Sequence, residues 1–273
     1  KIHLIGSNGF IGKNLVKNYP ENNFILWSHS GIKDTNYFDL LDEGSWNHLI
    51  KDRPKIVVLL SWPGLPNYDE SFHVKRNLPA CIKLFELLKD NGLEKIVITG
   101  SCYEYGLLNG LIKEESITNP VSQYGIAKDT LRKSIFKISE NSEVKVCWLR
   151  IFYVYGEDQN SKSLYPSLIE SIKMKSNFNI SSGRQIRDFV SIKIISKYLN
   201  LLINDKNIHG IFNGGSGVPI SIIEFVENII KAKNSNIKIN RFFYPDRNDE
   251  PLAFWADMKK IKRVFILENS NEY

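Results

Sequence analysis

The segment that most constrains the fold is the start of the chain, where a short apolar run, Ile2 to Ile5, passes directly into the sequence GSNGFIG. Gly6 permits a tight turn, Gly9 lets the backbone approach a phosphate without a Cβ in the way, and Gly12 lets a helix lie close to a sheet. The helix expected over Phe10 to Asn18 would direct its free N–H groups and its positive dipole end at an anion. A strand that turns into a helix in this way predicts a dinucleotide phosphate site at the head of a parallel sheet.

Further strands and helices are expected to alternate along the chain. Runs rich in β-branched and aromatic residues predict buried strands at Phe24 to Trp27, Ile56 to Leu60, Lys95 to Thr99 and Lys145 to Ile151. Apolar residues recur at intervals of three and four, which predicts helices over about Glu70 to Asp90, Ser122 to Ser139 and Ser191 to Ile203. This alternation indicates an α/β fold with a Rossmann-type doubly wound parallel sheet.

The later part of the chain is less regular and predicts a second, smaller unit. We expect residues 1–152, with a returning segment at about 188–213, to form a dinucleotide-binding Rossmann domain. Residues 153–187 and 214–273 are expected to form a C-terminal substrate-binding lobe over the carboxyl ends of the strands, where ligands bind in such sheets.

Composition argues against several other classes of protein. The lysines behind the net charge of +6 are scattered instead of massed, so nucleic acid is not expected as a partner. The apolar runs are too short to cross a bilayer and Lys1 directly precedes the first strand, so we expect no membrane segment, no signal peptide and a cytoplasmic location. The three cysteines, Cys81, Cys102 and Cys147, form no CxxC pair, which predicts reduced thiols and no metal site.

Three polar residues are the candidates for catalysis. Tyr124 and Lys128, in YGIAK, are spaced to lie on one face of a helix. A neighbouring ammonium and a cationic nicotinamide would lower the tyrosine pKa, which makes Tyr124 a candidate general acid or base. Ser101, in TGSCYEYG, lies at the carboxyl end of a predicted strand, where its hydroxyl could bind a substrate oxygen, although a serine there is often a turn residue.

In order and spacing, GSNGFIG, TGSCYEYG, YGIAK, GRQIRDFV and DRNDEPLAFWAD resemble the extended short-chain dehydrogenase/reductase family of nucleotide-sugar epimerases, dehydratases and reductases. The resemblance covers nearly the whole chain. It implies that Ser101 polarises the substrate oxygen, that Tyr124 transfers a proton, and that Lys128 holds the nicotinamide ribose and keeps the pKa of the tyrosine low. It also implies a nucleotide-sugar substrate and a homodimer formed through the helices at about 70–90 and 122–139.

The resemblance further implies binding residues. The expected cofactor-binding residues are Gly6, Asn8, Gly9, Phe10, Ile11, Gly12, Ser28, His29, Asp39, Leu40, Ser61, Asn77, Tyr124 and Lys128. The expected substrate-binding residues are Cys102, Tyr103, Tyr153, Leu164, Arg187 and Arg247. The two arginines would clamp the sugar diphosphate, a task suited to a rigid guanidinium fork. A surface salt bridge, for instance between Arg187 and Asp188, is the alternative for each arginine, and Leu164 could simply belong to the core.

Departures from the family pattern narrow the chemistry. The dehydratases carry an aspartate and a glutamate where this chain has Cys102 and Tyr103, so dehydration lacks its acid and base. One reductase of the family also epimerises, and for this it uses a cysteine and a histidine. In this chain the cysteine is displaced along the sequence and the histidine is replaced. Cys102 is therefore favoured as a small buried residue. Ser61, Trp62 and Pro63 replace the usual end of the third strand, and Tyr153 replaces an asparagine.

The end of the second strand bears on the choice of cofactor. An NAD-preferring site normally has an acidic residue there, whereas this chain has Trp27, Ser28, His29 and Ser30. His29 and Lys33 could bind a 2′-phosphate, so NADP (as NADPH) is favoured, with NAD as the alternative. We therefore expect NADPH-dependent reduction of a nucleotide-linked 4-keto-6-deoxy sugar, for deoxysugar or surface polysaccharide biosynthesis. A 4-epimerase with bound NAD and a non-catalytic dinucleotide-sensing regulator remain as alternatives.

Overall fold

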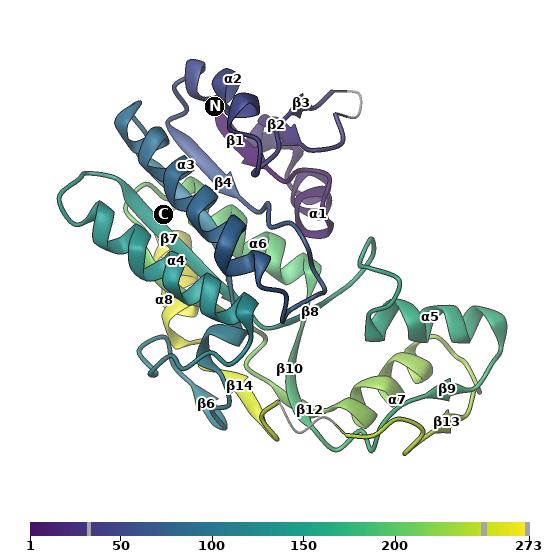
Figure 1. Ribbon diagram of the computed structural model, residues 1–273. Coiled ribbons are helices and arrows are strands. Elements are labelled where there is room, and N and C mark those ends of the chain that lie inside the picture. Colours follow the sequence, from purple (N-terminus) through teal and green to yellow (C-terminus); the bar gives the residue numbers. More distant parts are fainter. Residues whose placement is uncertain (32–33, 247–249, 271–273) are drawn as a thin grey trace.

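A seven-stranded parallel sheet forms the larger body of the computed structural model, which describes residues 1–31, 34–246 and 250–270 (Figure 1). In spatial order the strands are β11 (Gly210–Gly214), β7 (Lys145–Ile151), β5 (Lys95–Ser101), β4 (Ile56–Leu59), β1 (Ile2–Ile5), β2 (Phe24–Ser28) and β3 (Asn36–Tyr37). The direction of winding reverses between β1 and β4, which is the place where such sheets bind ligands. The predicted Rossmann-type α/β fold is confirmed.

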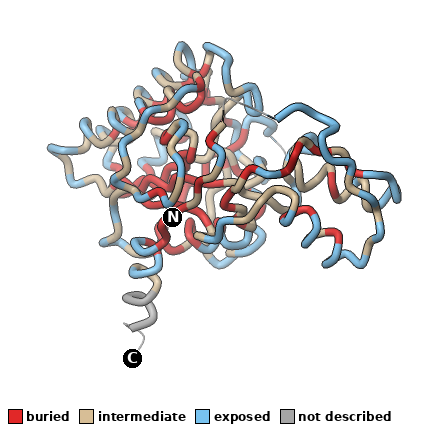
Figure 2. The backbone as a smooth tube through the Cα atoms, turned by 90° about the horizontal axis from the view of Figure 1, so that it is seen from below, coloured by how far each residue is buried: buried red, intermediate tan, exposed pale blue. Residues whose placement is uncertain are grey.

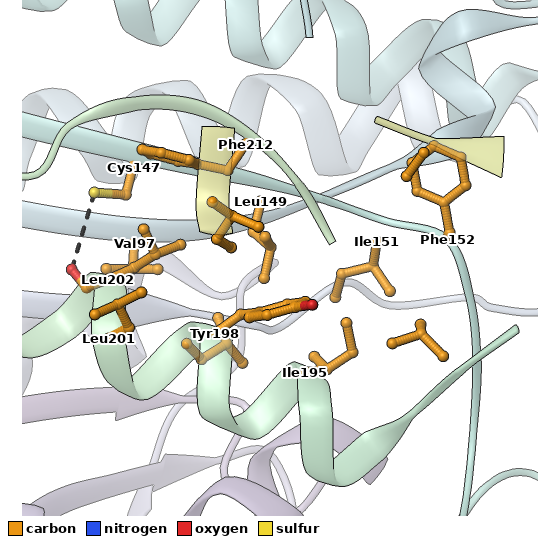
Figure 3. Close-up of a cluster of buried hydrophobic side chains, with 14 of the residues drawn as sticks. Val97, Cys147, Leu149, Ile151, Phe152, Ile195, Tyr198, Leu201, Leu202 and Phe212 are labelled. Carbon is orange, nitrogen blue, oxygen red and sulfur yellow. Dashed lines mark hydrogen bonds between the residues drawn. The ribbon is translucent and has the colours of Figure 1, made fainter. Parts of the chain in front are cut away.

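Helices cover both faces of this sheet, because neighbouring strand residues point to opposite sides and both sides are apolar. On one face lie α1 (Phe10–Asn18), α6 (Ile192–Asn204) and α8 (Lys259–Ser270). Figure 3 shows α6 on this face, with Ile195 and Tyr198 against Leu149 of β7. On the other face lie α2 (Asn47–Lys51), α3 (Leu78–Asp90) and α4 (Gln123–Ser139).

A smaller lobe lies to one side of the sheet (Figure 1). It contains α5 (Leu164–Met174), α7 (Ile222–Ala232) and the paired strands β9 (Phe178–Asn179) and β13 (Ile239–Asn240), packed around Leu168, Phe178 and Val226. A second sheet, of β12 (Pro219–Ser221), β10 (Ile186–Ser191) and β8 (Tyr153–Tyr155), lies between the two bodies. Figure 2 shows that buried positions concentrate in the larger body.

The remaining elements are short. β6 (Gly110–Ile112) pairs in parallel with β14 (Phe254–Ala256), and three 3₁₀ turns span Pro20–Asn22, Glu43–Trp46 and Cys102–Tyr105. A π-helical turn, η3 (His73–Asn77), leads directly into α3. None of the helices in the described segments has the length and apolar character needed to cross a membrane.

Two expectations differ from the structure in detail. The helix expected over about 70–90 is divided into η3 and α3, and Pro79 in the first turn of α3 explains why a regular α-helix can begin there, since proline donates no N–H. The helix α8 falls in the range expected for the C-terminal lobe, but its Ile261 packs in the core of the large sheet together with Phe212. The domain boundary at residue 152 itself stays a prediction.

Candidate active site

The turn between β1 and α1 has the shape required for a phosphate. Gly6 has φ of 90° and donates its N–H to Trp27 O at 2.9 Å, and a Cβ on Gly12 would lie 2.4 Å from Gly6 O. No side chain caps α1, whose N-cap is Gly9. The N–H groups of the first helical turn therefore point into open space, and the turn fits the pyrophosphate of a dinucleotide.

A cavity of about 550 Å³ opens from this turn toward the end of β2. Many of the predicted cofactor residues line it: Gly6, Asn8, Gly9, Ser28, His29, Asp39, Leu40 and Ser61. Asn8 Nδ2 donates to the Ser28 hydroxyl at 2.8 Å, which ties the glycine turn to the second strand. These residues could hold the adenosine end of a dinucleotide.

This cavity contains a carboxylate that the sequence argument about the 2′-phosphate did not take into account. Asp39 Oδ2 lies 3.4 Å from His29 Nδ1, and Asp39 Oδ1 accepts the Leu41 N–H at 2.9 Å. The exposed His29 imidazole therefore has an acidic neighbour instead of standing alone as a phosphate ligand. Lys33, the other residue considered for a 2′-phosphate, lies outside the described residues.

A second cavity, of about 470 Å³, lies on the other side of the glycine turn. It shares Gly6, Gly9, Leu60 and Trp62 with the first cavity. Its walls include further predicted residues: Phe10, Ile11, Gly12, Ser101, Cys102, Tyr103, Tyr124, Lys128, Tyr153 and Leu164. One continuous groove thus brings the proposed cofactor turn and the three catalytic candidates together.

The positions of the three candidates follow from local structure. Ser101 is the last residue of β5, and the Ser122 hydroxyl caps α4 by accepting the Gly125 N–H at 3.1 Å, so Tyr124 lies in the first turn of that helix. The Ser101 side chain lies within hydrogen-bonding reach of the Tyr124 hydroxyl. Lys128, one turn further, donates from Nζ to Thr99 O at 2.9 Å.

Burial sets the charge states of these groups. Burial raises the pKa of Tyr124 above its usual range, and the hydrogen bond with Ser101 offsets this only in part. Desolvation of the phenolate is the largest of the effects on this pKa, and the expected influence of Lys128 on it stays a prediction. Burial also lowers the pKa of Lys128 to about 8. At neutral pH Tyr124 carries the proton that it would donate.

A buried carboxylate holds the strand end that carries Ser101. Glu104 Oε1 accepts the Ser101 N–H at 2.8 Å and the Trp148 Nε1–H at 2.9 Å. The Ser101 hydroxyl in turn accepts the Tyr103 N–H at 3.2 Å, which completes a capping box. The orientation of Ser101 thus depends on residues outside the cavity.

Aromatic side chains enclose Tyr124, and one of them, Tyr68, was not expected from the sequence. Tyr68 stacks on Tyr103 with ring centroids 4.9 Å apart, and its edge contacts Tyr124 at 5.6 Å. Tyr68 also accepts the Tyr124 backbone N–H at 2.8 Å through its carbonyl. The loop that carries Tyr68 has no hydrophobic periodicity, so only its concentration of aromatic residues and prolines could have drawn attention to it in the sequence.

Two of the predicted residues that the structure describes do not line either half of the groove. Arg187 is buried, donates from Nη1 to Pro251 O at 2.7 Å and pairs with Glu250 at 2.8 Å. Asn77 is also buried, and it donates to Pro63 O at 2.9 Å, which anchors the loop after β4. Arg247 lies outside the described residues. The binding roles of all three stay predictions.

The alternative reading of Arg187 as a surface pair with Asp188 differs from the structure. Asp188 is fully buried and accepts from the Ser216 N–H at 2.6 Å, the Gly217 N–H at 2.9 Å and the Ala256 N–H at 3.0 Å. It therefore joins β10 to β14 and to the loop before β12, whereas Glu250 is the ion-pair partner of Arg187.

All three cysteines, Cys81, Cys102 and Cys147, are free and buried. Cys102 lies in the groove wall, and burial raises its pKa, so the thiol is neutral. Within the described segments, no three His, Cys, Asp or Glu side chains are grouped closely enough to hold a metal ion.

The sequence of this chain is similar to those of known proteins over most of its length. The model of the NAD dependent epimerase/dehydratase family matches residues 2–213. The dTDP-6-deoxy-L-talose 4-dehydrogenase (NAD(+)) of Aggregatibacter actinomycetemcomitans is 28% identical over 269 residues, which cover 93% of this chain and 98% of the relative. An uncharacterized UDP-glucose epimerase of Bacillus subtilis is 26% identical over 277 residues, which cover 97% of this chain and 84% of the relative.

A solved structure has the same fold. The UDP-N-acetylglucosamine 4-epimerase from Methanobrevibacter ruminantium, in complex with UDP-N-acetylmuramic acid, superposes with a TM-score of 0.85 at 23% identity. The superposition covers 97% of this chain and 91% of the other. It extends beyond the sheet into the C-terminal lobe.

Proposed function

The chain belongs to the NAD-dependent epimerase/dehydratase family of extended short-chain dehydrogenase/reductase enzymes, and from this premise we propose that it interconverts a 4-hydroxyl and a 4-keto group on a nucleotide-linked 6-deoxyhexose. The observation that carries the proposal is the convergence of Ser101, Tyr124 and Lys128 on a cavity continuous with the glycine turn. The similarity to the 4-dehydrogenase of a 6-deoxyhexose, over nearly the full length of both chains, supports the substrate class.

We propose NAD(H) as the cofactor, in place of the NADPH that the sequence favoured. The Asp39 carboxylate beside His29 would repel a 2′-phosphate, and the dehydrogenase relative is named for NAD(+). Residues from Gly6 to Gly12 would hold the pyrophosphate, Asp39 and Leu40 would contact the adenosine, and Lys128 would bind the nicotinamide ribose. When bound, the cofactor supplies or accepts the hydride at the sugar C4.

The chain's own residues would manage the proton. In the reducing direction Tyr124 donates its hydroxyl proton to the former carbonyl oxygen, while Ser101 hydrogen-bonds that oxygen as negative charge develops. The protonated form of Tyr124 dominates at neutral pH, so its hydroxyl has a proton to donate in this direction. The oxidising direction is the reverse, in which the sugar hydroxyl gives its proton to the phenolate form of Tyr124 as the hydride leaves C4.

A 4-epimerase is the second candidate, favoured by the full-length similarity to an uncharacterized UDP-glucose epimerase. Such an enzyme returns the hydride to the same sugar, so it consumes no cofactor. We further propose a homodimer formed through α3 and α4, which lie side by side on one face of the sheet (Figure 1).

The Tyr124→Phe variant, with Tyr198→Phe as a control on the far side of the sheet, tests the proposal. NADH oxidation is followed with 4-keto-6-deoxy sugars linked to dTDP, CDP, GDP and UDP. We expect the kcat of Tyr124→Phe to fall by a factor of about 10² to 10⁴, while its affinity for NADH is retained. Unchanged turnover in this variant would remove Tyr124 from the reaction, and product formed without cofactor consumption would favour the epimerase.

A further inference from the structure

Trp62 lies at the junction of the groove and is one of the departures from the family pattern. Its side chain lines both the cavity at the end of β2 and the cavity that holds the catalytic candidates. It lies in the loop that leaves the sheet after β4, beyond Leu60 and Ser61. Such a position makes the indole a neighbour of any dinucleotide that spans the groove.

Contacts on the side of η3 orient the indole. Trp62 Nε1 donates to His73 Nδ1 at 3.0 Å, and the two rings are stacked, with an interplanar angle of 20°. His73 Nε2 lies 2.8 Å from Asn67 O, which requires that nitrogen to be the donor and leaves Nδ1 as the acceptor. His73 is fully buried and lies on a π-helical turn, a feature that often occurs at functional sites.

The face of the same indole covers Lys128. Lys128 Nζ lies 4.0 Å from the centroid of the Trp62 ring, well within the range of a cation–π interaction. An ammonium has three N–H donors, of which one goes to Thr99 O. Trp62 also contacts Tyr124 edge-on, with centroids 6.0 Å apart. One aromatic ring thus touches both members of the tyrosine and lysine pair.

We propose that Trp62 is a positioning residue for Lys128, whose ammonium it holds charged and aimed into the groove through the indole face that His73 orients. The consequence for turnover rests on the proposed function, but the effect on Lys128 itself does not. The ring matters because Lys128 is 3% exposed and has little water to stabilise its charge.

Other groups around Lys128 act on its charge as well. Glu104 of the turn after β5 and Cys81 of α3 raise its pKa, and Tyr124 of its own helix α4 lies with its ring centroid 5.9 Å from Nζ. Burial outweighs Glu104 and Cys81 and lowers the pKa of Lys128 to about 8. An aliphatic side chain at position 62 would remove the negative face of the ring and supply no polar partner in its place, so the charged form of Lys128 would become less stable.

The test is a titration of Lys128 by NMR on the full chain labelled with ¹⁵N at lysine Nζ, with the signal assigned from Lys128→Met. We expect the midpoint to fall by about one pH unit in Trp62→Leu, because a desolvated cation–π contact has about that strength. Trp62→Phe keeps an aromatic face and should titrate close to wild type. Trp255→Leu on β14 removes a tryptophan elsewhere and should leave the midpoint unchanged.

The outcomes separate this inference from the proposed function. A midpoint in Trp62→Leu equal to that of wild type overturns the inference, and a fall of similar size in Trp62→Phe would show that the aromatic face is not the cause. Should Trp62→Leu not fold, Trp62→Met offers a flexible side chain that adapts to part of the space of the indole, and it carries the same expectation. The titration needs no sugar, so failure of every 4-keto sugar as a substrate would refute the proposed function alone.

Discussion

Glu104 Oε2 and Arg150 Nε lie 2.7 Å apart, and both side chains are almost completely buried. The other carboxylate oxygen of Glu104 accepts the Ser101 N–H at 2.8 Å. A buried ion pair thus fixes the end of β5 that carries Ser101. This arrangement links the stability of the sheet to the geometry of the groove.

The Glu104→Gln variant tests that link. The substitution keeps the shape of the side chain but leaves the Arg150 charge without its partner, which should lower the free energy of unfolding by about 3 to 5 kcal/mol. Urea denaturation measures the change. Glu94→Gln is the matched control, because its pair with Lys55 is exposed and should contribute less than about 1 kcal/mol. Equal effects in the two variants would contradict the structural role of the buried pair.

The lowered pKa of Lys128 predicts how the free energy of unfolding changes with pH. Its pKa is lowered from 10.5 to about 8 in the folded protein, so between these values the unfolded chain binds more protons than the folded chain. The contribution of Lys128 to stability therefore rises with pH across this window and is least favourable below it. Any stability advantage of Lys128→Met over wild type should shrink as the pH rises from about 8 to about 10. The control is Lys133→Met, at an exposed lysine. A difference in unfolding free energy between Lys128→Met and wild type that does not change with pH would count against the buried ammonium.

Asp39 is expected to govern the choice between NAD and NADP. The Asp39→Asn variant removes the charge beside His29, so the ratio of the NADP to the NAD dissociation constant should fall by about fivefold. Isothermal titration with the two cofactors measures this ratio. Asp90→Asn, at the far end of α3, should leave the ratio at its wild-type value. A wild-type protein that already binds NADP more tightly than NAD would refute the assignment.

The proposed homodimer makes a prediction about mass. Light scattering at micromolar concentration should give twice the 31.5 kDa of one chain. Because α3 and α4 are the proposed interface, Glu86→Arg, at an exposed position of α3, should shift the mass toward that of the monomer. A monomeric wild-type protein would rule out this assembly.

The fold and part of the groove could be predicted from the sequence, because they follow from patterns of residues that are close together along the chain. The limits of α1 are those expected, since Gly9 and the apolar spacing after it define a helix start, and Tyr124 and Lys128 share a helix face by spacing alone. The parallel sheet followed from buried strands alternating with helices.

The remaining features depend on contacts between distant segments, which no local pattern reports. The pairing of Arg187 with Glu250 and the approach of Asp39 to His29 require the folded chain. The raised pKa of Tyr124 has the same origin, because the sequence shows the neighbouring lysine but not the depth of burial. Trp62 was visible only as a departure from a pattern, and its contact with Lys128 became apparent in three dimensions.

The most direct test of the proposed function follows one hydrogen atom. The protein is incubated with NADH deuterated at the transferable position of nicotinamide C4 and with a dTDP-linked 4-keto-6-deoxyhexose, and the sugar is examined by NMR and mass spectrometry. We expect one deuterium at C4 of the product for each NADH consumed, and none with Tyr124→Phe over the same time. A sugar product that carries no deuterium, or that forms without NADH consumption, would contradict the account.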